Sequence, residues 1–150
     1  MKKFLAILTT TFLVASSFAF EPNFDPRVSE KVLKSFNETF TTAEDIKWET
    51  FDTYYAVSFS QAGIQSRVNY DKNGSMISSL RYYAPSMLPL NVYNRIKNSY
   101  ANKEMFGVTE VSFNNEVTYY VKLQDAKTWT TVKVDGTGNA HVVEKYKKAR

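Results

Sequence analysis

The sequence predicts an α+β protein made of two tandem repeats, each with one helix packed on a four-stranded antiparallel meander. Three observations lead to this fold class: apolar and polar residues alternate with period two, turn-forming residues separate the alternating stretches, and the pattern occurs twice. Residues 46–83 and 111–146 are the two copies of the strand pattern. Because only two copies occur, the pattern indicates an internal duplication rather than a solenoid.

The two copies are offset by a nearly constant shift. The pairs that match at a shift of 64 are Tyr55/Tyr119, Val57/Val121, Phe59/Leu123, Asp71/Asp135 and Gly74/Gly138. Ile46 and Trp48 match Val111 and Phe113 at a shift of 65, which predicts that the second copy lost one residue in its first turn.

Residues 1–19 are predicted to be a secretory signal peptide. Lys2 and Lys3 form its positive start, a short apolar run follows, and small residues allow cleavage after Ala19 or Ser17. The apolar run is too short to span a membrane, and no other stretch is long and apolar enough to do so. We therefore expect the protein to be exported, either to the periplasm or into the medium.

The first repeat is expected to cover residues 24–83 and to begin with a helix from about Pro26 to Phe40. Asp25 would be the N-cap of this helix and Pro26 its first residue. Val28, Val32, Leu33, Phe36 and Phe40 form its apolar stripe. Strands are expected near residues 46–51, 54–60, 67–70 and 76–83, with Gly74 in the last hairpin loop.

Residues 84–89 are expected to be a linker, because two prolines disfavour both a helix and a strand ladder there. The second repeat would cover residues 90–147, with a helix that follows Pro89. Its strands are expected near residues 108–114, 117–124, 128–134 and 140–147. The pattern leaves open whether the two sheets join edge to edge into one curved eight-stranded surface.

The residues that usually carry catalysis or bind metals are scarce. The chain has no cysteine and only one histidine, His141, so the usual zinc ligands are missing. The loops at Asp71 and Asp135 lack the carboxylates of an EF-hand, and no nucleophile elbow or phosphate loop occurs. Because the carboxylates are scattered, we predict a protein that is not an enzyme and that has no metal or other cofactor.

The charge of the chain argues against nucleic acid as a partner. The formal net charge of +4 includes Lys2 and Lys3, so the mature chain is near +2. A surplus this small gives little attraction to phosphates. A protein partner is the expectation that remains, and the sequence names neither that partner nor the oligomeric state.

The sheet face that points away from the helices is the predicted binding site. The residues expected there are Tyr54, Arg67, Arg81, Tyr83, Tyr120, Lys122, Trp129 and Lys133. Aromatic side chains between cations are typical of protein-binding hot spots, although an ordinary solvated ladder of cross-strand pairs is an alternative. By contrast, Trp48 is expected to lie under the first helix, against Phe36 or Phe40.

Two functions are compatible with these residues. The first is an exported, non-catalytic module that binds or inhibits a protein partner through the open sheet face. The alternative is a small-ligand carrier or an enzyme with a pocket between helix and sheet. Two or more carboxylates, or Tyr and Arg groups, converging in such a pocket would favour the alternative.

Several motifs in a fixed order resemble one known family. They are F-x-x-x-F before D-I-K-W-E, then T-Y-Y-A-V-S-F, Y-D-K-N-G-S, L-P-L-N-V, Y-Y-V-K-L and V-D-G-T-G. Over residues 24–147 the chain resembles the PepSY-like family of exported proteins, described as beta-lactamase-inhibitor-like and known chiefly from Bacteroidetes. The resemblance implies tandem helix-plus-sheet units and an inhibitory or chaperoning role. No stretch matches the inhibitory loops of beta-lactamase inhibitors, and the disulfides of those inhibitors have no counterpart here.

Overall fold

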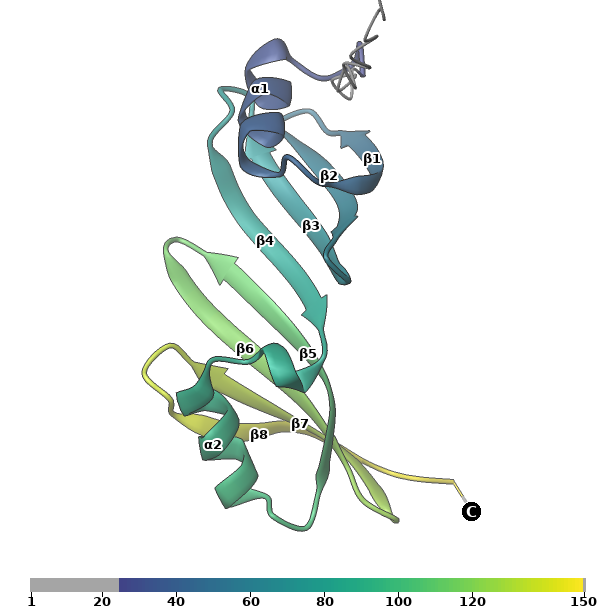
Figure 1. Ribbon diagram of the computed structural model, residues 1–150, viewed down its shortest axis with the longest axis vertical. Coiled ribbons are helices and arrows are strands. Elements are labelled where there is room, and N and C mark those ends of the chain that lie inside the picture. Colours follow the sequence, from purple (N-terminus) through teal and green to yellow (C-terminus); the bar gives the residue numbers. More distant parts are fainter. Residues whose placement is uncertain (1–24, 150) are drawn as a thin grey trace, which may run out of the picture.

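The computed structural model describes residues 25–149, so the signal peptide predicted at residues 1–19 lies outside the described residues. In the described residues, one α-helix followed by four strands occurs twice along the chain, in the predicted order (Figure 1). The elements are α1 (Glu30–Thr39), β1 (Glu44–Thr50), β2 (Tyr54–Gln61), β3 (Ile64–Asp71), β4 (Met76–Tyr83), the 3-10 helix η1 (Pro85–Met87), α2 (Leu90–Ser99), β5 (Glu104–Phe113), β6 (Glu116–Gln124), β7 (Thr128–Asp135) and β8 (Ala140–Lys147).

The eight strands form one continuous antiparallel sheet whose strand order follows the chain from β1 to β8. The predicted fold of two repeats, each with its own four-stranded meander, is therefore wrong. The finding that overturns it is the pairing of β4 with β5, from Ser78 opposite Phe113 to Tyr83 opposite Val108. This pairing satisfies the backbone groups of two strands that would otherwise be exposed edges. The edge-to-edge joining that the sequence left open is the arrangement observed.

Both helices lie on the same face of the sheet, and each covers a separate core (Figure 1). The first core, between α1 and the sheet, consists of Val28, Val32, Leu33, Phe36, Tyr55, Val57, Phe59, Val68 and Tyr70. The second core, between α2 and the sheet, consists of Tyr83, Leu88, Val92, Ile96, Val108, Val121, Leu123, Val132 and Val134. We call this the helix face and its opposite the open face.

Trp48 lies on the helix face, as expected. Its indole packs edge to face against Phe36, with ring centroids 5.3 Å apart, and lies 6.4 Å from Tyr70. The side chain is half-buried rather than fully buried, because β1 is the edge strand of the sheet.

The first helix begins at Glu30 rather than at Pro26, and Ser29 occupies its N-cap position. The predicted N-cap, Asp25, instead forms an ion pair with Arg27 at 2.7 Å. A carboxylate that accepts hydrogen bonds from its neighbour's guanidinium is not capping α1, and residues 26–28 form a turn before the helix.

The linker predicted at residues 84–89 contains a short 3-10 helix, Pro85–Met87. Proline is tolerated in the first turn of a helix, where its missing N–H has no acceptor to lose. Pro89 then precedes α2 directly, as expected. The domain boundaries predicted around this segment stay a prediction.

The pairing of strands also corrects the predicted alignment of the two copies. Trp48 pairs with Val57, whereas Val121, the counterpart of Val57, pairs with Val108. Val108 therefore occupies the place of Trp48 in the second half, and the expected match with Phe113 is wrong. Those two positions of β5 are an odd number of residues apart, so their side chains point to opposite faces.

The two matched hairpins meet different surroundings. Gly74 has φ +92°, and a Cβ there would lie 2.9 Å from the carbonyl oxygen of Lys31 in α1. The tip of the β3–β4 hairpin thus touches the backbone of the first helix. Gly138 has nearly the same φ, +91°, but nothing lies within 4 Å of its Cβ position.

Candidate binding surfaces

The open face carries most of the predicted site residues. Tyr54, Arg67, Tyr120, Lys122, Trp129 and Lys133 all lie there, because their neighbours in each strand are buried on the helix face. The structure separates these residues into groups that differ in their surroundings.

In the second half, a polar hollow of about 680 Å³ forms on the open face of β5 to β8. Tyr120 lies opposite Lys133, and Lys122 opposite Thr131. The Lys122 ammonium donates a hydrogen bond to the Thr131 hydroxyl at 3.0 Å and lies 3.5 Å from the Glu144 carboxylate. His141 and Val143 line the same hollow, which therefore combines cations, an aromatic ring and an aliphatic wall.

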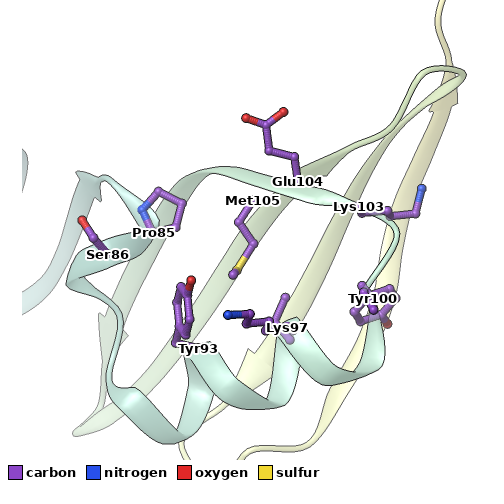
Figure 2. Close-up of a pocket in the computed structure, with 10 residues that line it drawn as sticks. Pro85, Ser86, Tyr93, Lys97, Tyr100, Lys103, Glu104 and Met105 are labelled. Atoms are coloured by element: carbon purple, nitrogen blue, oxygen red, sulfur yellow. The ribbon is translucent and has the colours of Figure 1, made fainter.

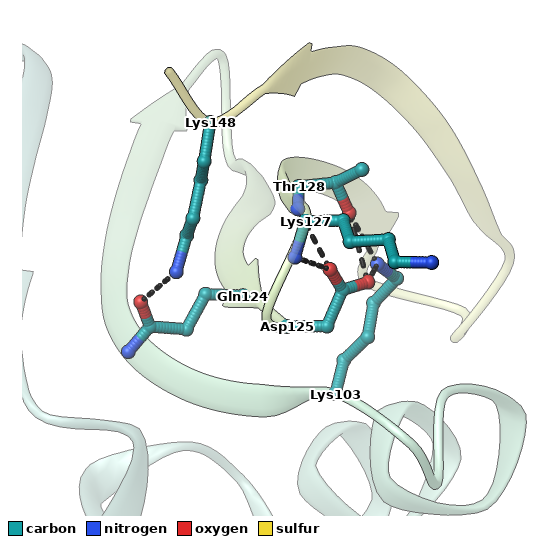
Figure 3. A network of polar contacts seen from close by, with 6 residues as sticks. All are labelled: Lys103, Gln124, Asp125, Lys127, Thr128 and Lys148. Carbon is teal, nitrogen blue, oxygen red and sulfur yellow. Dashed lines mark hydrogen bonds and ion pairs between the residues drawn. The ribbon is translucent and has the colours of Figure 1, made fainter. Parts of the chain in front are cut away.

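Trp129 lies beyond this hollow in a cluster of exposed side chains at the far end of β7. Its side chain is 41% exposed, and its ring packs edge to face on Phe106 at 5.1 Å. The Lys148 ammonium lies 4.3 Å from the centre of the indole and donates to the Gln124 side chain at 3.0 Å (Figure 3). Tyr146, the cross-strand partner of Trp129, is 62% exposed. We call Phe106, Trp129, Tyr146 and Lys148 the aromatic cluster.

The structure does not bring Tyr54 and Tyr120 to Trp129. Tyr120 pairs with Lys133, four residues along β7 from Trp129. Tyr54 is on β2, five strands away, which at about 4.8 Å per strand places it roughly 24 Å distant. Instead, Tyr54 stacks on Phe51 with ring centroids 4.4 Å apart.

Arg67 is engaged within the protein. Its guanidinium donates two hydrogen bonds to Glu49, at 3.0 and 2.8 Å, and a third to Ser58 at 3.3 Å. These bonds lower the pKa of the Glu49 carboxyl and raise that of Arg67. Arg67 and Glu49 therefore form a structural ion pair on the first half of the open face.

Arg81 and Tyr83 do not lie on the open face, and their predicted placement there is wrong. Tyr83 is buried in the second core, and its hydroxyl donates to Glu110 at 2.6 Å. Arg81 donates to the same carboxylate at 3.0 Å. Burial, followed by this hydrogen bond, raises the pKa of Tyr83 far above its usual range. The two side chains connect β4 to β5 on the helix face.

A β-bulge explains this error. The register between β3 and β4 shifts at Tyr70, which pairs with Met76, while Asn69 pairs with Ser78. The extra residue, Ile77, reverses the facing of the rest of β4 relative to strict alternation. Tyr82, which the predicted placement of Arg81 and Tyr83 would put on the helix face by alternation, is consequently 46% exposed on the open face.

Sequence reasoning also missed several exposed apolar residues of the open face. They are Tyr82, Phe106, Phe113, Val143 and Tyr146. Bulges precede Gly107 in β5 and lie opposite Thr131 in β8, and both shift the alternation that would have revealed these side chains. Gly107, isolated inside a strand pattern, was the one signal of a bulge available in the sequence.

A cavity of about 470 Å³ lies between α2 and β5. Figure 2 shows Tyr93 and Lys97 of the helix, and Met105 of β5, pointing into it, whereas the Glu104 carboxylate points away. The Lys103 ammonium also points away, toward the β6–β7 hairpin, where it contacts Asp125 and donates to Thr128 at 2.8 Å (Figure 3).

Lys103, the residue before β5, forms a clamp: its ammonium group joins the start of β5 to the β6–β7 hairpin. The Asp125 carboxylate also accepts hydrogen bonds from the backbone N–H groups of Lys127 and Thr128, at 2.8 and 2.7 Å. The bond from Lys103, followed by these, holds the pKa of Asp125 well below its usual range. The clamp therefore fixes the hairpin beside the aromatic cluster.

Within residues 25–149, no group of three His, Cys, Asp or Glu side chains is placed to hold a metal ion. The same residues include no helix with the length and apolar character needed to cross a bilayer.

No family model matches the sequence, and neither does any curated protein. Solved structures do match. A DUF2874 family protein from Bacteroides ovatus shares 20% identity at a TM-score of 0.58, covering 80% of this chain and 87% of that one. A BLIP-like protein from Bacteroides fragilis shares 19% identity at 0.59, covering 85% and 91%. A protein from Bacteroides eggerthii, described as periplasmic, shares 16% identity at 0.58, covering 80% and 88%.

These likenesses identify the fold as beta-lactamase-inhibitor-like. At identities this low they show the fold alone. The expected resemblance to such inhibitors is confirmed at that level, and the PepSY-like assignment is not confirmed.

Proposed function

We propose that this protein is an exported, non-catalytic module that binds a protein partner through the open face of its sheet. The observation that carries the proposal is the aromatic cluster, in which Trp129, Phe106 and Tyr146 are all more than one third exposed on a face that no helix covers. Large rigid rings bury much area on binding and lose little side-chain entropy, which is why they dominate hot spots.

The neighbouring charges support a polar rim around this cluster. Lys133 and Lys122 border the hollow beside it, and Lys148 is already held against the Trp129 ring. A centre of aromatic residues with cations at its margin is the usual arrangement of a protein-binding surface. We expect the partner to carry carboxylates opposite these lysines.

The non-catalytic part of the proposal rests on how the carboxylates of the two faces are used. Glu49 is held by Arg67, Glu110 by Arg81 and Tyr83, and Asp125 by Lys103. Each acts as a structural ion pair or hydrogen-bond acceptor. The predicted signal peptide supports export, and the periplasmic description of the Bacteroides eggerthii neighbour favours the periplasm over the medium.

A second candidate function is the carriage of a small ligand in the cavity between α2 and β5. Its volume of about 470 Å³ and the Tyr93, Ile96 and Met105 side chains, with Lys97 pointing into it, fit a small apolar molecule that carries an anionic group. Met105→Trp should fill the cavity and abolish the fluorescence of bound anilinonaphthalene sulfonate. Enhancement of equal strength in this variant would exclude the cavity as the dye site.

Trp129→Ala tests the proposed face. Mature protein would first capture its partner from a periplasmic extract, and the purified partner would then be titrated by calorimetry. We expect the variant to bind more weakly by about 2 kcal/mol or more, because a central aromatic anchor is lost. The melting temperature should change little, since Trp129 belongs to neither core.

Phe51→Ala is the matched control for that titration. Phe51 is also an exposed aromatic residue, but it lies on the first half of the chain, stacked on Tyr54. We expect full-strength binding by this variant. If folded Trp129→Ala protein binds at full strength, the aromatic cluster is not the binding surface.

A further inference from the structure

Strand β8 is an open edge of the sheet. It pairs with β7 on one side, and within residues 25–149 no other strand pairs with its second side. All of its residues after Ala140 are exposed, among them Val142, Val143 and Tyr146 at 46%, 42% and 62%. Long exposed edges of this kind can pair with a strand from another chain.

The end of the ladder shows which backbone groups point outward. The N–H of Lys148 donates to the carbonyl of Lys127 at 2.8 Å, across from β7. Hydrogen-bonded and non-hydrogen-bonded pairs alternate along an antiparallel ladder, so Tyr146 also bonds inward. Lys147 and Lys145 alternate with these inward-bonded positions, so their N–H and C=O groups point away from the sheet.

The side chains at these outward positions are cationic. Lys145 and Lys147 are both exposed, and among the described residues neither has a carboxylate within ion-pair distance. The nearby Glu144 carboxylate lines the hollow, where it pairs with the Lys122 ammonium and accepts a hydrogen bond from the Thr131 hydroxyl. The outward edge of β8 therefore combines unused backbone groups with two unpaired positive charges at alternate positions.

The opposite edge of the sheet is built differently. In β1 the register shifts between Glu44 and Lys47, and Asp45 has a positive φ of 54°. Such bulges prevent a further strand from pairing in register. The side chains of Ile46 and Trp48 on this strand also pack against the first core. The sheet thus has one blunted edge and one available edge.

We propose that the edge of β8 accepts an extended acidic segment of a partner protein as a ninth strand. Main-chain hydrogen bonds from the outward groups of Lys145 and Lys147 would give affinity, and alternate acidic side chains would pair with their ammonium groups. This site is on the edge rather than the open face, so it goes beyond the function proposed above and does not depend on it.

The charges also disfavour a second copy of this chain as the occupant. Antiparallel pairing of β8 with its own copy around a two-fold axis must match residues that share a face. The registers centred on residues 144, 145 and 146 place Glu144 opposite Glu144, Lys145 opposite Lys145, and Lys145 opposite Lys147 of the second chain, respectively. Like charges directly opposite each other destabilise a strand pair. An acidic strand meets no such penalty.

The test uses a fluorescein-labelled peptide of alternating glutamate and valine, measured by fluorescence anisotropy against the mature protein. We expect saturable binding that weakens with added salt, and loss of more than ~10-fold in affinity for Lys145→Glu/Lys147→Glu. Lys31→Glu/Lys34→Glu, on exposed positions of α1, changes the net charge equally and should bind normally. Equal losses in the two double variants would overturn the proposal.

Amide hydrogen exchange provides the readout for strand addition. The peptide should slow exchange at Lys145 and Lys147 and leave Tyr146, already bonded to β7, unchanged. Peptide binding without new protection at Lys145 and Lys147 would contradict the proposed geometry. A concentration-dependent dimer that Lys147→Pro abolishes would replace the acidic segment with a second copy. Trp129→Ala should bind the peptide normally, which separates this site from the open face.

Discussion

The two halves of the molecule share their elements but differ in where their aromatic residues lie. Under α1 the rings of Phe36, Phe40, Phe59, Trp48 and Tyr70 contact one another in the core. Under α2 the core is mainly aliphatic, and the second half exposes its rings in the aromatic cluster instead. Rings in a core add stability, whereas exposed rings are available for recognition. The first half thus places most of its rings in a core, whereas the second leaves several of its rings accessible to solvent.

The largest expected loss of stability comes from a substitution in the first core. Phe36 is fully buried and contacts three other rings, so Phe36→Ala should lower the free energy of unfolding by about 4 kcal/mol. Ile96 is a fully buried residue of α2, and Ile96→Ala should lower the free energy of unfolding by about 3 kcal/mol. Urea unfolding of both variants measures the difference. A larger loss for Ile96→Ala would contradict the comparison.

The next effect concerns Trp48 and Val108, which occupy equivalent positions in the two ladders. Trp48→Ala removes a large but half-buried ring and should cost about 3 kcal/mol. Val108→Ala removes two buried methyl groups and should cost about 2 kcal/mol. The urea midpoints of the two variants compare these losses, provided that the slope of the unfolding free energy against urea concentration is the same in both. An unchanged midpoint for Trp48→Ala would show that its contact with Phe36 adds no stability.

Two buried tyrosines should respond in opposite directions to the loss of a hydroxyl. The hydroxyl of Tyr83 donates to Glu110, so Tyr83→Phe should destabilise by about 1.5 kcal/mol. The hydroxyl of Tyr70 is buried without a hydrogen-bond partner, so Tyr70→Phe should stabilise by about 1 kcal/mol. Thermal unfolding of the two variants is the measurement. Shifts of the same sign would refute the assignment of these hydroxyls.

The smallest effect is on acid stability, through the matched hairpin residues Asp71 and Asp135. The Thr137 hydroxyl and then the Asn139 amide lower the pKa of Asp135 from 3.8 to about 2. Because this pKa is depressed on folding, the stabilisation is present above about pH 3.8 and is lost as the pH falls toward 2. Asp135→Asn should flatten this decline.

Asp71 serves as the control in the acid titration. Its pKa is lowered mainly by the backbone N–H of Ser75. The Asp71 carboxylate accepts hydrogen bonds from the backbone N–H groups of Asn73 and Ser75, whereas that of Asp135 also accepts hydrogen bonds from the Thr137 hydroxyl and the Asn139 amide. Asp71→Asn should therefore flatten the decline less than Asp135→Asn does when unfolding midpoints are followed below about pH 4. The reverse order would show that the second hairpin does not hold its carboxylate more tightly.

Sequence patterns predicted the elements well where alternation was unbroken. The strands around Tyr55 and Val132, the helix α2 after Pro89, and the inward side of Trp48 all follow from period and turn residues. The exposure of Trp129 follows from the burial of its neighbours in β7. These features depend on local residues alone, so a single sequence suffices to predict them.

The errors occur where a bulge or a distant pairing decides the outcome. Arg81 and Tyr83 were assigned to the wrong face because the bulge at Ile77 leaves no clear mark in composition. The pairing of β4 with β5 depends on groups on both sides of the α2 segment, which alternation within one strand cannot reveal. The aromatic cluster was missed in part for the same reason, since Phe106 follows a bulge of β5.

The meander order of the sheet has a consequence for folding kinetics. Because every strand pairs with its neighbour in the chain, most ladders close short loops and can form within microseconds to milliseconds. Only the β4–β5 ladder must wait until residues 84–103 have looped back. We therefore predict that the two ends of the sheet nucleate independently and that the closure joining them, through Arg81 and Glu110, sets the folding rate.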